Sequence, residues 1–214
     1  MTKVYCISGM GCDHRVFKRL SVPGYEFVPL PWVPYEDSDS LVSYAKKMLV
    51  NIKEDNPIVL GLSLGGMLAV EIGKLIPTKK IILISSAKTK AELPDPGRLG
   101  RYIVRQRLIP PFCFALPNRF LMGLRGIVPF TERMDRASAV SGRFMQWALK
   151  AVMDWDNAVV PPNTVHLHGT MDIVIPGRNV KADHIIKHGQ HLMVFNRAGE
   201  VNGILADILT DTRA

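Results

Sequence analysis

The segment Pro57-Ile-Val-Leu-Gly-Leu-Ser-Leu-Gly-Gly-Met-Leu-Ala-Val-Glu-Ile-Gly73 decides how the rest of the chain is interpreted. Its apolar start, Ile58 to Leu60, is typical of a buried strand, and from Met67 onward apolar residues recur at helical spacing. Ser63 lies where the two meet, with glycines on both sides that permit a sharp turn and a close helix. A Gly-x-Ser-x-Gly sequence between a strand and a helix presents a serine hydroxyl at the end of a sheet as a nucleophile.

Such a segment has two other uses: a tight strand-to-helix turn with an incidental serine, and a phosphate-binding loop. A phosphate-binding loop needs Gly-x-x-x-x-Gly-Lys-Ser/Thr, and no lysine follows these glycines. The strand before Ser63 and the helix after it favour a nucleophile over an incidental serine.

Composition places the chain among ordinary globular proteins. With 214 residues, of which 47% are hydrophobic, it suits one domain with a sizeable core and room for an inserted subdomain. No apolar run approaches the roughly 20 residues of a membrane span, and no signal-peptide pattern is seen, so we expect a cytoplasmic protein without stable membrane insertion. Cys6, Cys12 and Cys113 form no CxxC pair and indicate neither a disulfide framework nor a zinc site, and Cys6 is expected to be a small core hydrophobe.

Short apolar runs alternate with helical patterns along most of the chain. A helix is predicted from Asp37–Asp39 to Ile52, and a terminal helix is predicted to open at Asn196. Because the strands are continuously apolar, they indicate a parallel sheet covered on both faces, and the fold class is α/β. Besides Ile58–Leu60, the predicted strands are Val4–Ile7, Tyr25–Leu30, Lys80–Ser85, Thr164–Thr170 and Asp183–Lys187.

The alternation stops after Ala87. Residues 88–156 carry several prolines between apolar helical pieces, which predicts an inserted helical cap over a core formed by residues 1–87 and 157–214. The apolar face of the cap is expected to line a substrate pocket, although burial against the main domain explains most such residues equally well. Candidates for contact with substrate are Met10, Phe112 and Phe114, whereas Trp147 and Trp155 are predicted to be packing residues.

The net charge of +8 is concentrated in the predicted cap, where two lysines and nine arginines between Lys88 and Arg143 face four acidic residues. Such a surplus attracts anionic substrates, anionic membranes or nucleic acid, but it is equally explained by the solvated face of cap helices. No nucleic-acid-binding motif accompanies it, so we expect no nucleic-acid partner.

A second glycine loop follows the first strand, at Ser8-Gly9-Met10-Gly11. A dinucleotide-binding loop would need a third glycine at position 14, which is His14. The alternative use of such a loop is to direct backbone N–H groups at a developing oxyanion. Asp13 is then expected to cap the short helix that follows.

Two further polar residues come directly after predicted strands. Asp172 follows the strand at 164–170, although an Asx turn is an alternative role for it. His191 follows the last strand and a glycine-containing loop, with His188 and His184 as competitors. Ser63, Asp172 and His191 occur in the order Ser, Asp, His, in which the imidazole deprotonates the serine and the carboxylate fixes its tautomer.

Backbone N–H groups of Met10 and Leu64 would complete the site as an oxyanion hole. His166 and His168 alternate along one strand and, with Asp172, faintly suggest metal ligands. Their spacing matches no metal-binding signature, so no metal is expected.

Taken together, these motifs resemble those of α/β-hydrolases, in particular a small bacterial serine esterase with a helical cap. Gly61-Leu-Ser-Leu-Gly-Gly66 resembles the nucleophile elbow, His168-Gly-Thr-Met-Asp-Ile-Val-Ile-Pro176 the acid loop, and Gly189-Gln-His-Leu-Met193 the histidine loop. The loop at Ser8–Gly11 is similar to the oxyanion loop of small bacterial members, although Ser8 stands where a histidine is usual. Because the chain begins at what would be the third strand of the family, the resemblance implies a reduced, mostly parallel sheet of about six strands.

The resemblance implies hydrolysis of an ester, thioester or amide through an acyl-enzyme, without a cofactor. An apolar cap favours acyl chains, so a carboxylesterase or acyl-thioesterase with a small-molecule substrate is expected. A serine at position 63 argues against a haloalkane dehalogenase, which uses aspartate there. The alternatives are a protein that binds a small ligand without hydrolysis, and a lyase or C–C hydrolase. Whether the protein is a monomer or a homodimer is left open.

Overall fold

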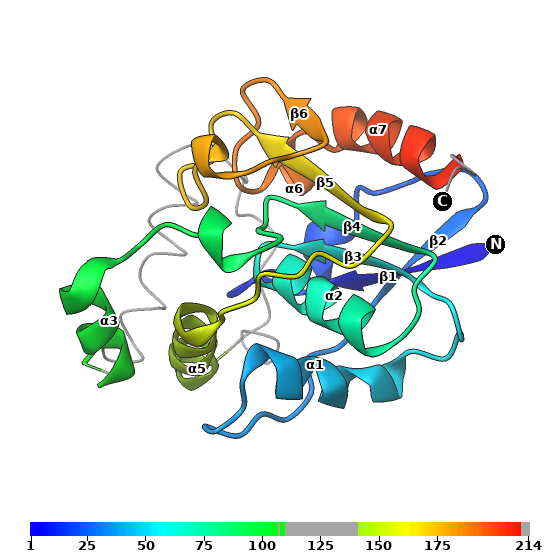
Figure 1. Ribbon diagram of the computed structural model, residues 1–214. Coiled ribbons are helices and arrows are strands. Elements are labelled where there is room, and N and C mark those ends of the chain that lie inside the picture. The colour runs from blue at the N-terminus through cyan, green and yellow to red at the C-terminus, as the bar shows by residue number, and fades with distance from the viewer. Residues whose placement is uncertain (107, 110–140, 211–214) are drawn as a thin grey trace.

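The computed structural model describes residues 1–106, 108–109 and 141–210 (Figure 1). Within them, six strands form one sheet in the order β2-β1-β3-β4-β5-β6, and every pairing is parallel. This confirms the predicted α/β class and the reduced sheet. The strands are β1 (Thr2–Ile7), β2 (Tyr25–Pro29), β3 (Ile58–Leu62), β4 (Lys80–Ile84), β5 (Thr164–Gly169) and β6 (His184–Ile186).

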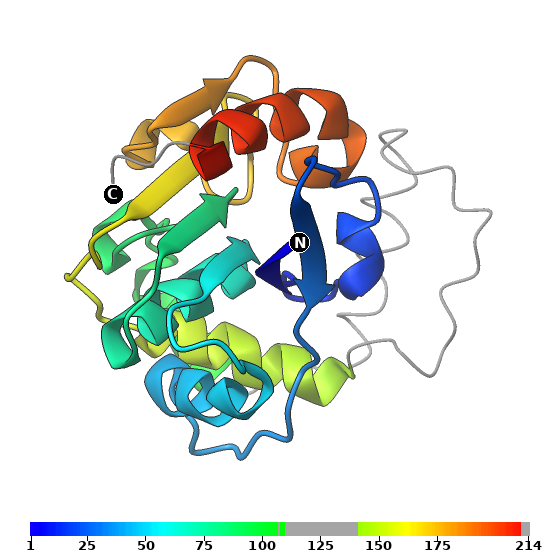
Figure 2. The same cartoon turned by 90° about the vertical axis from the view of Figure 1, so that its right-hand side faces the viewer.

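Helices cover both faces of the sheet (Figure 1, Figure 2). Alternate strand residues face opposite sides, so Tyr5 and Ile7 join one apolar cluster while Val4 and Cys6 join the other. The first cluster packs against α1 (Leu41–Met48), α2 (Leu64–Leu75) and α5 (Gly142–Asp154). The second packs against the 3-10 helix η1 (His14–Phe17), α6 (Met193–Asn196) and α7 (Ala198–Thr210).

Two helix starts differ from the sequence prediction. Helix α1 begins at Leu41 rather than near Asp37, because Ser40 and Ser43 form a reciprocal capping box. Asp39 is instead buried beside the helix, where its carboxylate accepts hydrogen bonds from Ser43 Oγ at 2.8 Å and Lys47 Nζ at 2.7 Å. The terminal helix α7 begins at Ala198, and the residue predicted to open it, Asn196, ends the short helix α6.

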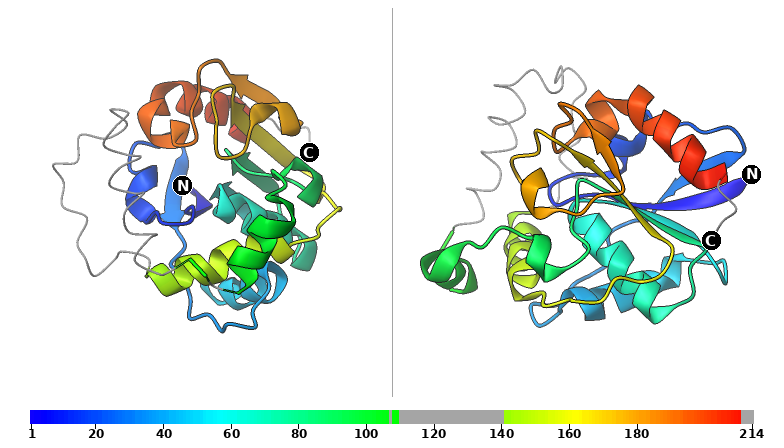
Figure 3. Two further views of the ribbon diagram at one scale, coloured as in Figure 1. Left: turned by 90° about the vertical axis from the view of Figure 1, so that its left-hand side faces the viewer. Right: turned by 45° about the horizontal axis from the view of Figure 1, so that its top comes forward.

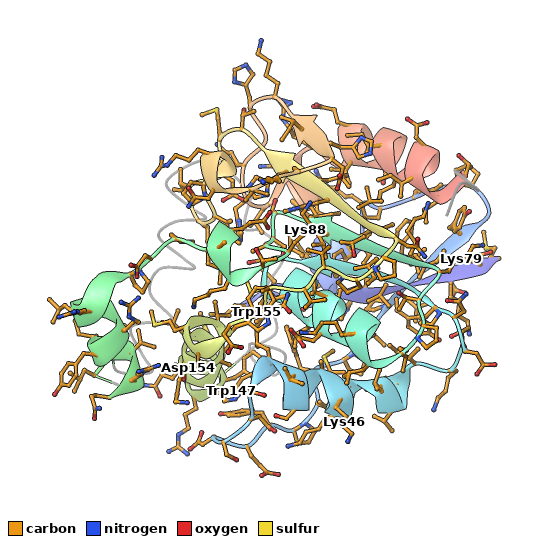
Figure 4. All side chains as sticks on the ribbon, in the orientation of Figure 1. Lys46, Lys79, Lys88, Trp147, Asp154 and Trp155 are labelled. Atoms are coloured by element: carbon orange, nitrogen blue, oxygen red, sulfur yellow. The ribbon has the colours of Figure 1, made fainter. Side chains whose placement is uncertain are left out.

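Helix α5 packs into the core through aromatic side chains. Trp147 is 1% exposed, packs against Tyr44 with 4.6 Å between ring centroids, and donates its indole N–H to the backbone oxygen of Asp39 at 2.9 Å. Trp155 donates to Glu71 Oε1 of α2 at 2.7 Å. Figure 4 labels both indoles on the side of the sheet where α1 and α2 lie. Both tryptophans are packing residues, as predicted.

The carboxyl ends of the strands point toward the side of the molecule where α3 (Gly97–Arg105) and α5 lie (Figure 1, Figure 3). Helix α3 lies beyond α5 and is joined to it by an ion pair between Arg105 and Asp154. These two helices and the 3-10 helix η3 (Lys90–Glu92) are the described part of the predicted cap. Phe112 and Phe114 lie outside the described residues.

Cys6 is 1% exposed in β1, and burial raises the pKa of its thiol, so it is the core hydrophobe that the sequence predicted. Among the helices described, none is long and apolar enough to cross a membrane.

Candidate active site

Ser63 lies in a strained turn between β3 and α2. Its φ of 53° falls in the left-handed region, which residues with a Cβ adopt only where surrounding contacts impose it. Those contacts are hydrogen bonds: its N–H donates to Ile84 O at 3.0 Å, and its carbonyl accepts from Gly66 N at 2.9 Å and Ser86 Oγ at 2.7 Å. The turn is therefore fixed by hydrogen bonds to the end of β4, to Ser86 shortly after it and to the first turn of α2.

Glycines allow this turn to sit so close to its neighbours. A Cβ at Gly61 would overlap the backbone of Gly65, and a Cβ at Gly65 would overlap the backbone carbonyl of Ile7. The start of α2 is thereby packed directly against the ends of β1 and β3. This is the close approach for which the sequence pattern provides glycine.

His191 and Asp172 meet at Ser63. His191 Nε2 lies 2.9 Å from Ser63 Oγ, and His191 Nδ1 lies 2.8 Å from Asp172 Oδ2. Since the carboxylate can only accept, Nδ1 carries the ring proton and Nε2 is free to accept from the serine hydroxyl. The structure thus brings together the three side chains that the sequence singled out, 109 and 19 residues apart along the chain.

The other oxygen of Asp172 forms the Asx turn that was the alternative role for this residue. Oδ1 accepts hydrogen bonds from the backbone N–H groups of Val174 at 2.9 Å and Ile175 at 3.0 Å. The carboxyl group is 0% exposed, so these two donors also hold its orientation toward His191. Asp172 therefore makes both contacts, the Asx turn through Oδ1 and the hydrogen bond to His191 through Oδ2.

The histidine loop rests on the end of β5. A Cβ at Gly169 would overlap the backbone carbonyl of Gly189, and Met171 N donates to that carbonyl at 2.8 Å. The competitors lie elsewhere: His188 is in an exposed turn with φ 60°, and His184 begins β6. Of the described histidines, His191 is the one hydrogen-bonded to Ser63.

The loop after β1 also packs on Ser63. A Cβ at Gly9 would lie 3.3 Å from Ser63 Cβ. The loop is closed by Cys12 N donating to Gly9 O at 3.0 Å and Ser8 Oγ donating to Cys12 O at 3.1 Å. Leu64 is the first residue of α2, where a backbone N–H has no partner within its own helix. The two segments proposed to supply oxyanion donors thus flank the hydroxyl.

Comparison with known families agrees with this geometry. The sequence pattern described as the alpha/beta hydrolase family matches residues 5–203. The chain belongs to the alpha/beta hydrolase family. A comparison with curated protein sequences finds no significant match.

Solved structures of other alpha/beta hydrolases share the fold at low identity. An esterase from Exiguobacterium antarcticum is 17% identical with a TM-score of 0.69, covering 99% of this chain and 92% of that one. The type II thioesterase of the borrelidin biosynthetic cluster is 14% identical with a TM-score of 0.69, covering 97% and 92%. A thermophilic esterase from Thermogutta terrifontis is 15% identical with a TM-score of 0.66, covering 98% and 89%. At such identity the likeness concerns the fold of this alpha/beta hydrolase.

Asp13 plays the capping role that the sequence predicted. It is the N-cap of η1, and its carboxylate accepts from Arg15 N at 2.9 Å. Although burial favours the protonated form, the hydrogen bonds and charge of Arg15 hold the pKa of Asp13 below its usual value. This pair anchors the segment that follows the Gly9–Gly11 loop.

His166 and His168 form a buried pair beneath the acid loop of this alpha/beta hydrolase. Burial lowers the pKa of His166 to about 3, and the neighbouring His168 and Lys88 act in the same direction. Among the described residues, no group of three or more His, Cys, Asp or Glu side chains is placed to hold a metal ion. Burial therefore keeps the His166 ring neutral inside the protein.

Sequence analysis missed Ser86, whose hydroxyl supports the carbonyl of Ser63. A signal was present, because Ser85 and Ser86 come directly after β4 in the same way that Asp172 follows β5. Polar residues just beyond a buried parallel strand collect at one edge of the sheet.

Proposed function

We propose that this alpha/beta hydrolase is a serine hydrolase that cleaves a carboxylic ester or thioester with an apolar acyl group. The observation that carries the proposal is the unbroken hydrogen-bond chain from Ser63 Oγ through His191 to Asp172, with distances of 2.9 and 2.8 Å. Nucleophile and base are within proton-transfer reach, and the base is oriented by a third group.

In the proposed reaction, His191 Nε2 takes the proton of Ser63 as the hydroxyl oxygen attacks the carbonyl carbon. Asp172 keeps the ring in this tautomer and stabilises the imidazolium. His191 then gives the proton to the departing alcohol or thiol, which leaves an acyl-enzyme. A water molecule activated by the same imidazole hydrolyses the acyl-enzyme and releases the acid.

The negative charge that develops on the carbonyl oxygen would be received by the backbone N–H groups of Leu64 and Met10. The position of Leu64 at the first turn of α2 supports this role, because the positive end of the helix dipole faces the same point. One such donor is typically worth roughly 3 to 4 kcal/mol of activation free energy.

An apolar acyl group is supported by the surroundings of the Gly9–Gly11 loop. Met10 packs against the apolar cluster that contains Phe144, and Trp32 lies against the ring of Phe144 with 4.9 Å between centroids. The indole N–H of Trp32 is 3.5 Å from Cys12 O in the same loop. We propose that Met10 contacts the acyl chain, and that residues 88–156 form a cap to which Phe112 and Phe114 contribute further contacts.

The esterase and thioesterase relatives support both substrate classes, since they resemble this chain to the same degree. We further propose a cytoplasmic location, which is supported by Cys6 and Cys12 being free thiols. Cell fractionation would check this, and recovery in a secreted fraction would contradict it.

The nucleophile is tested by labelling with a fluorophosphonate probe followed by peptide mapping. We expect the label on the peptide that carries Ser63, with Ser63→Ala losing both the label and ester turnover at an unchanged melting temperature. Ser38→Ala is the control, because it removes a hydroxyl from the exposed loop before α1 and should still be labelled. Turnover that survives Ser63→Ala would place the nucleophile elsewhere.

Substrate class is tested on the active enzyme with a panel of nitrophenyl esters and acyl thioesters of increasing chain length. We expect kcat/KM to rise with acyl length over the shorter members, because each buried methylene contributes about 0.8 kcal/mol. A ligand that binds tightly without any turnover would favour the non-hydrolytic alternative.

A further inference from the structure

Two histidines lie where a parallel sheet normally carries aliphatic side chains. His166 and His168 are both 0% exposed and project from the same face of β5. Their strand neighbour Leu167 faces the opposite apolar cluster. Buried imidazoles are costly unless their nitrogens are hydrogen-bonded, so their partners indicate what the pair does.

A carbonyl partner identifies the protonated nitrogen of His168. His168 Nε2 lies 2.9 Å from Ile175 O, and because a carbonyl only accepts, Nε2 carries the proton. His168 Nδ1 lies 3.3 Å from His166 Nε2, and with His168 neutral this Nδ1 accepts the Nε2 proton of His166, whose own Nδ1 is buried without a hydrogen-bond partner. The two rings are perpendicular, with 5.2 Å between centroids. In this arrangement His166 donates to His168, and His168 donates to the backbone of the acid loop at Ile175.

These hydrogen bonds end on the residues that hold Asp172. Ile175, whose carbonyl accepts from His168, donates its own N–H to Asp172 Oδ1 at 3.0 Å. His168 Nε2 also lies 3.6 Å from Asp172 Oδ2, the oxygen that accepts from His191. The buried Nε2–H group of His168 therefore faces both the backbone carbonyl of Ile175 and the carboxylate of Asp172.

We propose that His168, supported by His166, is a positioning residue that fixes the loop of Asp172 and thereby the alignment of His191 on Ser63. The inference rests on the proposed serine chemistry. His168 touches neither substrate nor the reacting atoms, so it acts through Asp172. A small displacement of a catalytic group is enough to lower the rate, because a misplacement of about 1 Å costs on the order of 100-fold.

The kinetic test compares His168→Leu, which fills the space without a donor, with His168→Gln, whose amide N–H can reach the carbonyl of Ile175. We expect His168→Leu to lower kcat roughly 10- to 100-fold with KM within about twofold, and His168→Gln to recover most of kcat. His184→Leu, on the neighbouring strand, is the control and should stay within about twofold of the parent. A His168→Leu enzyme with unchanged kcat, or equal losses in the leucine and glutamine variants, would overturn the proposal.

A measurement on the unaltered protein keeps the proposal testable if His168→Leu does not fold. Labelling histidine with ¹⁵N distinguishes protonated from bare ring nitrogens by NMR, and the glutamine variants at 166 and 168 assign the signals. We expect the proton of each ring on Nε2 and a bare Nδ1 on His168. A proton on Nδ1 of His168 would overturn the proposal. Absence of any turnover in the parent would instead refute the proposed function, and the NMR result would still decide the tautomers.

Discussion

Replacing Asp172 with asparagine should reverse the tautomer of His191 while leaving the fold almost unchanged. The two side chains have the same shape, but asparagine has one oxygen and one NH₂ group. Two orientations of the amide are available, and the structure selects between them. Oδ1 receives two backbone N–H groups, from Val174 and Ile175, which need an acceptor at that position.

Turning the amide so that NH₂ faces these donors would leave two buried N–H groups unpaired. Each unpaired group costs about 1 to 3 kcal/mol, so the turned orientation is disfavoured by about 2 to 6 kcal/mol. In the favoured orientation the N–H of the new amide points at His191 Nδ1, which must then be bare. The ring proton moves to Nε2, where it faces Ser63 Oγ and prevents the ring from acting as a base.

The expected loss is about 10⁴-fold in kcat, equivalent to about 5.4 kcal/mol of activation free energy. The assay is steady-state hydrolysis of a nitrophenyl ester together with a thermal melt. Asp207→Asn, which makes the same change on the exposed face of α7, is the control and should retain full activity. An Asp172→Asn enzyme with more than about a tenth of the parental kcat would refute the tautomer argument.

Two predictions concern stability. Gly65→Ala should lower the free energy of unfolding by at least about 2 kcal/mol, because the new Cβ meets the backbone carbonyl of Ile7. Gly203→Ala, on open helix surface, should instead raise it by about 0.5 to 1 kcal/mol. Equal urea midpoints for the two variants would contradict this prediction. His166 takes up a proton near its ordinary pKa of 6.5 when unfolded but near 3 when folded, so its contribution to stability is present above pH 6.5 and is lost as the pH falls toward 3. His166→Leu should therefore flatten the fall of unfolding free energy with acid by up to about 1.4 kcal/mol per pH unit, and parallel curves would argue against a neutral buried ring.

The sheet and the position of Ser63 were predictable from local sequence. Strands buried on both faces must be apolar throughout, so the runs at 4–7, 58–60 and 80–85 are visible without any knowledge of their neighbours. Ser63 was predictable because a sharp strand-to-helix turn and a close helix both require glycine. The order Ser, Asp, His along the chain then predicted the other two residues of the candidate site, Asp172 and His191.

The start of α1 could not be predicted from the sequence, and the reason is physical. Asp37, Asp39 and Ser40 are all good N-cap residues, so local chemistry ranks them equally. The capping box with Ser43 selects Ser40, and a tertiary contact holds the residue before it, because the backbone carbonyl of Asp39 accepts from Trp147, 108 residues away along the chain. The proposed role of His168 could not be predicted for a similar reason, because its hydrogen-bond partner is the backbone carbonyl of Ile175, which has no sequence signature.

The site is assembled from backbone contacts rather than from long side chains reaching toward one another. Gly65 brings α2 against β1, Gly9 brings the first loop against Ser63, and Gly169 brings the histidine loop against β5. Each contact joins segments that follow different strands, so the parallel sheet sets the distances between the reacting groups. The esterase and thioesterase structures compared above share this fold. Beside the Gly9–Gly11 loop, Trp32 packs on Phe144 of α5, whose ring lies in the core, and this apolar surrounding is the support for the proposed apolar acyl group.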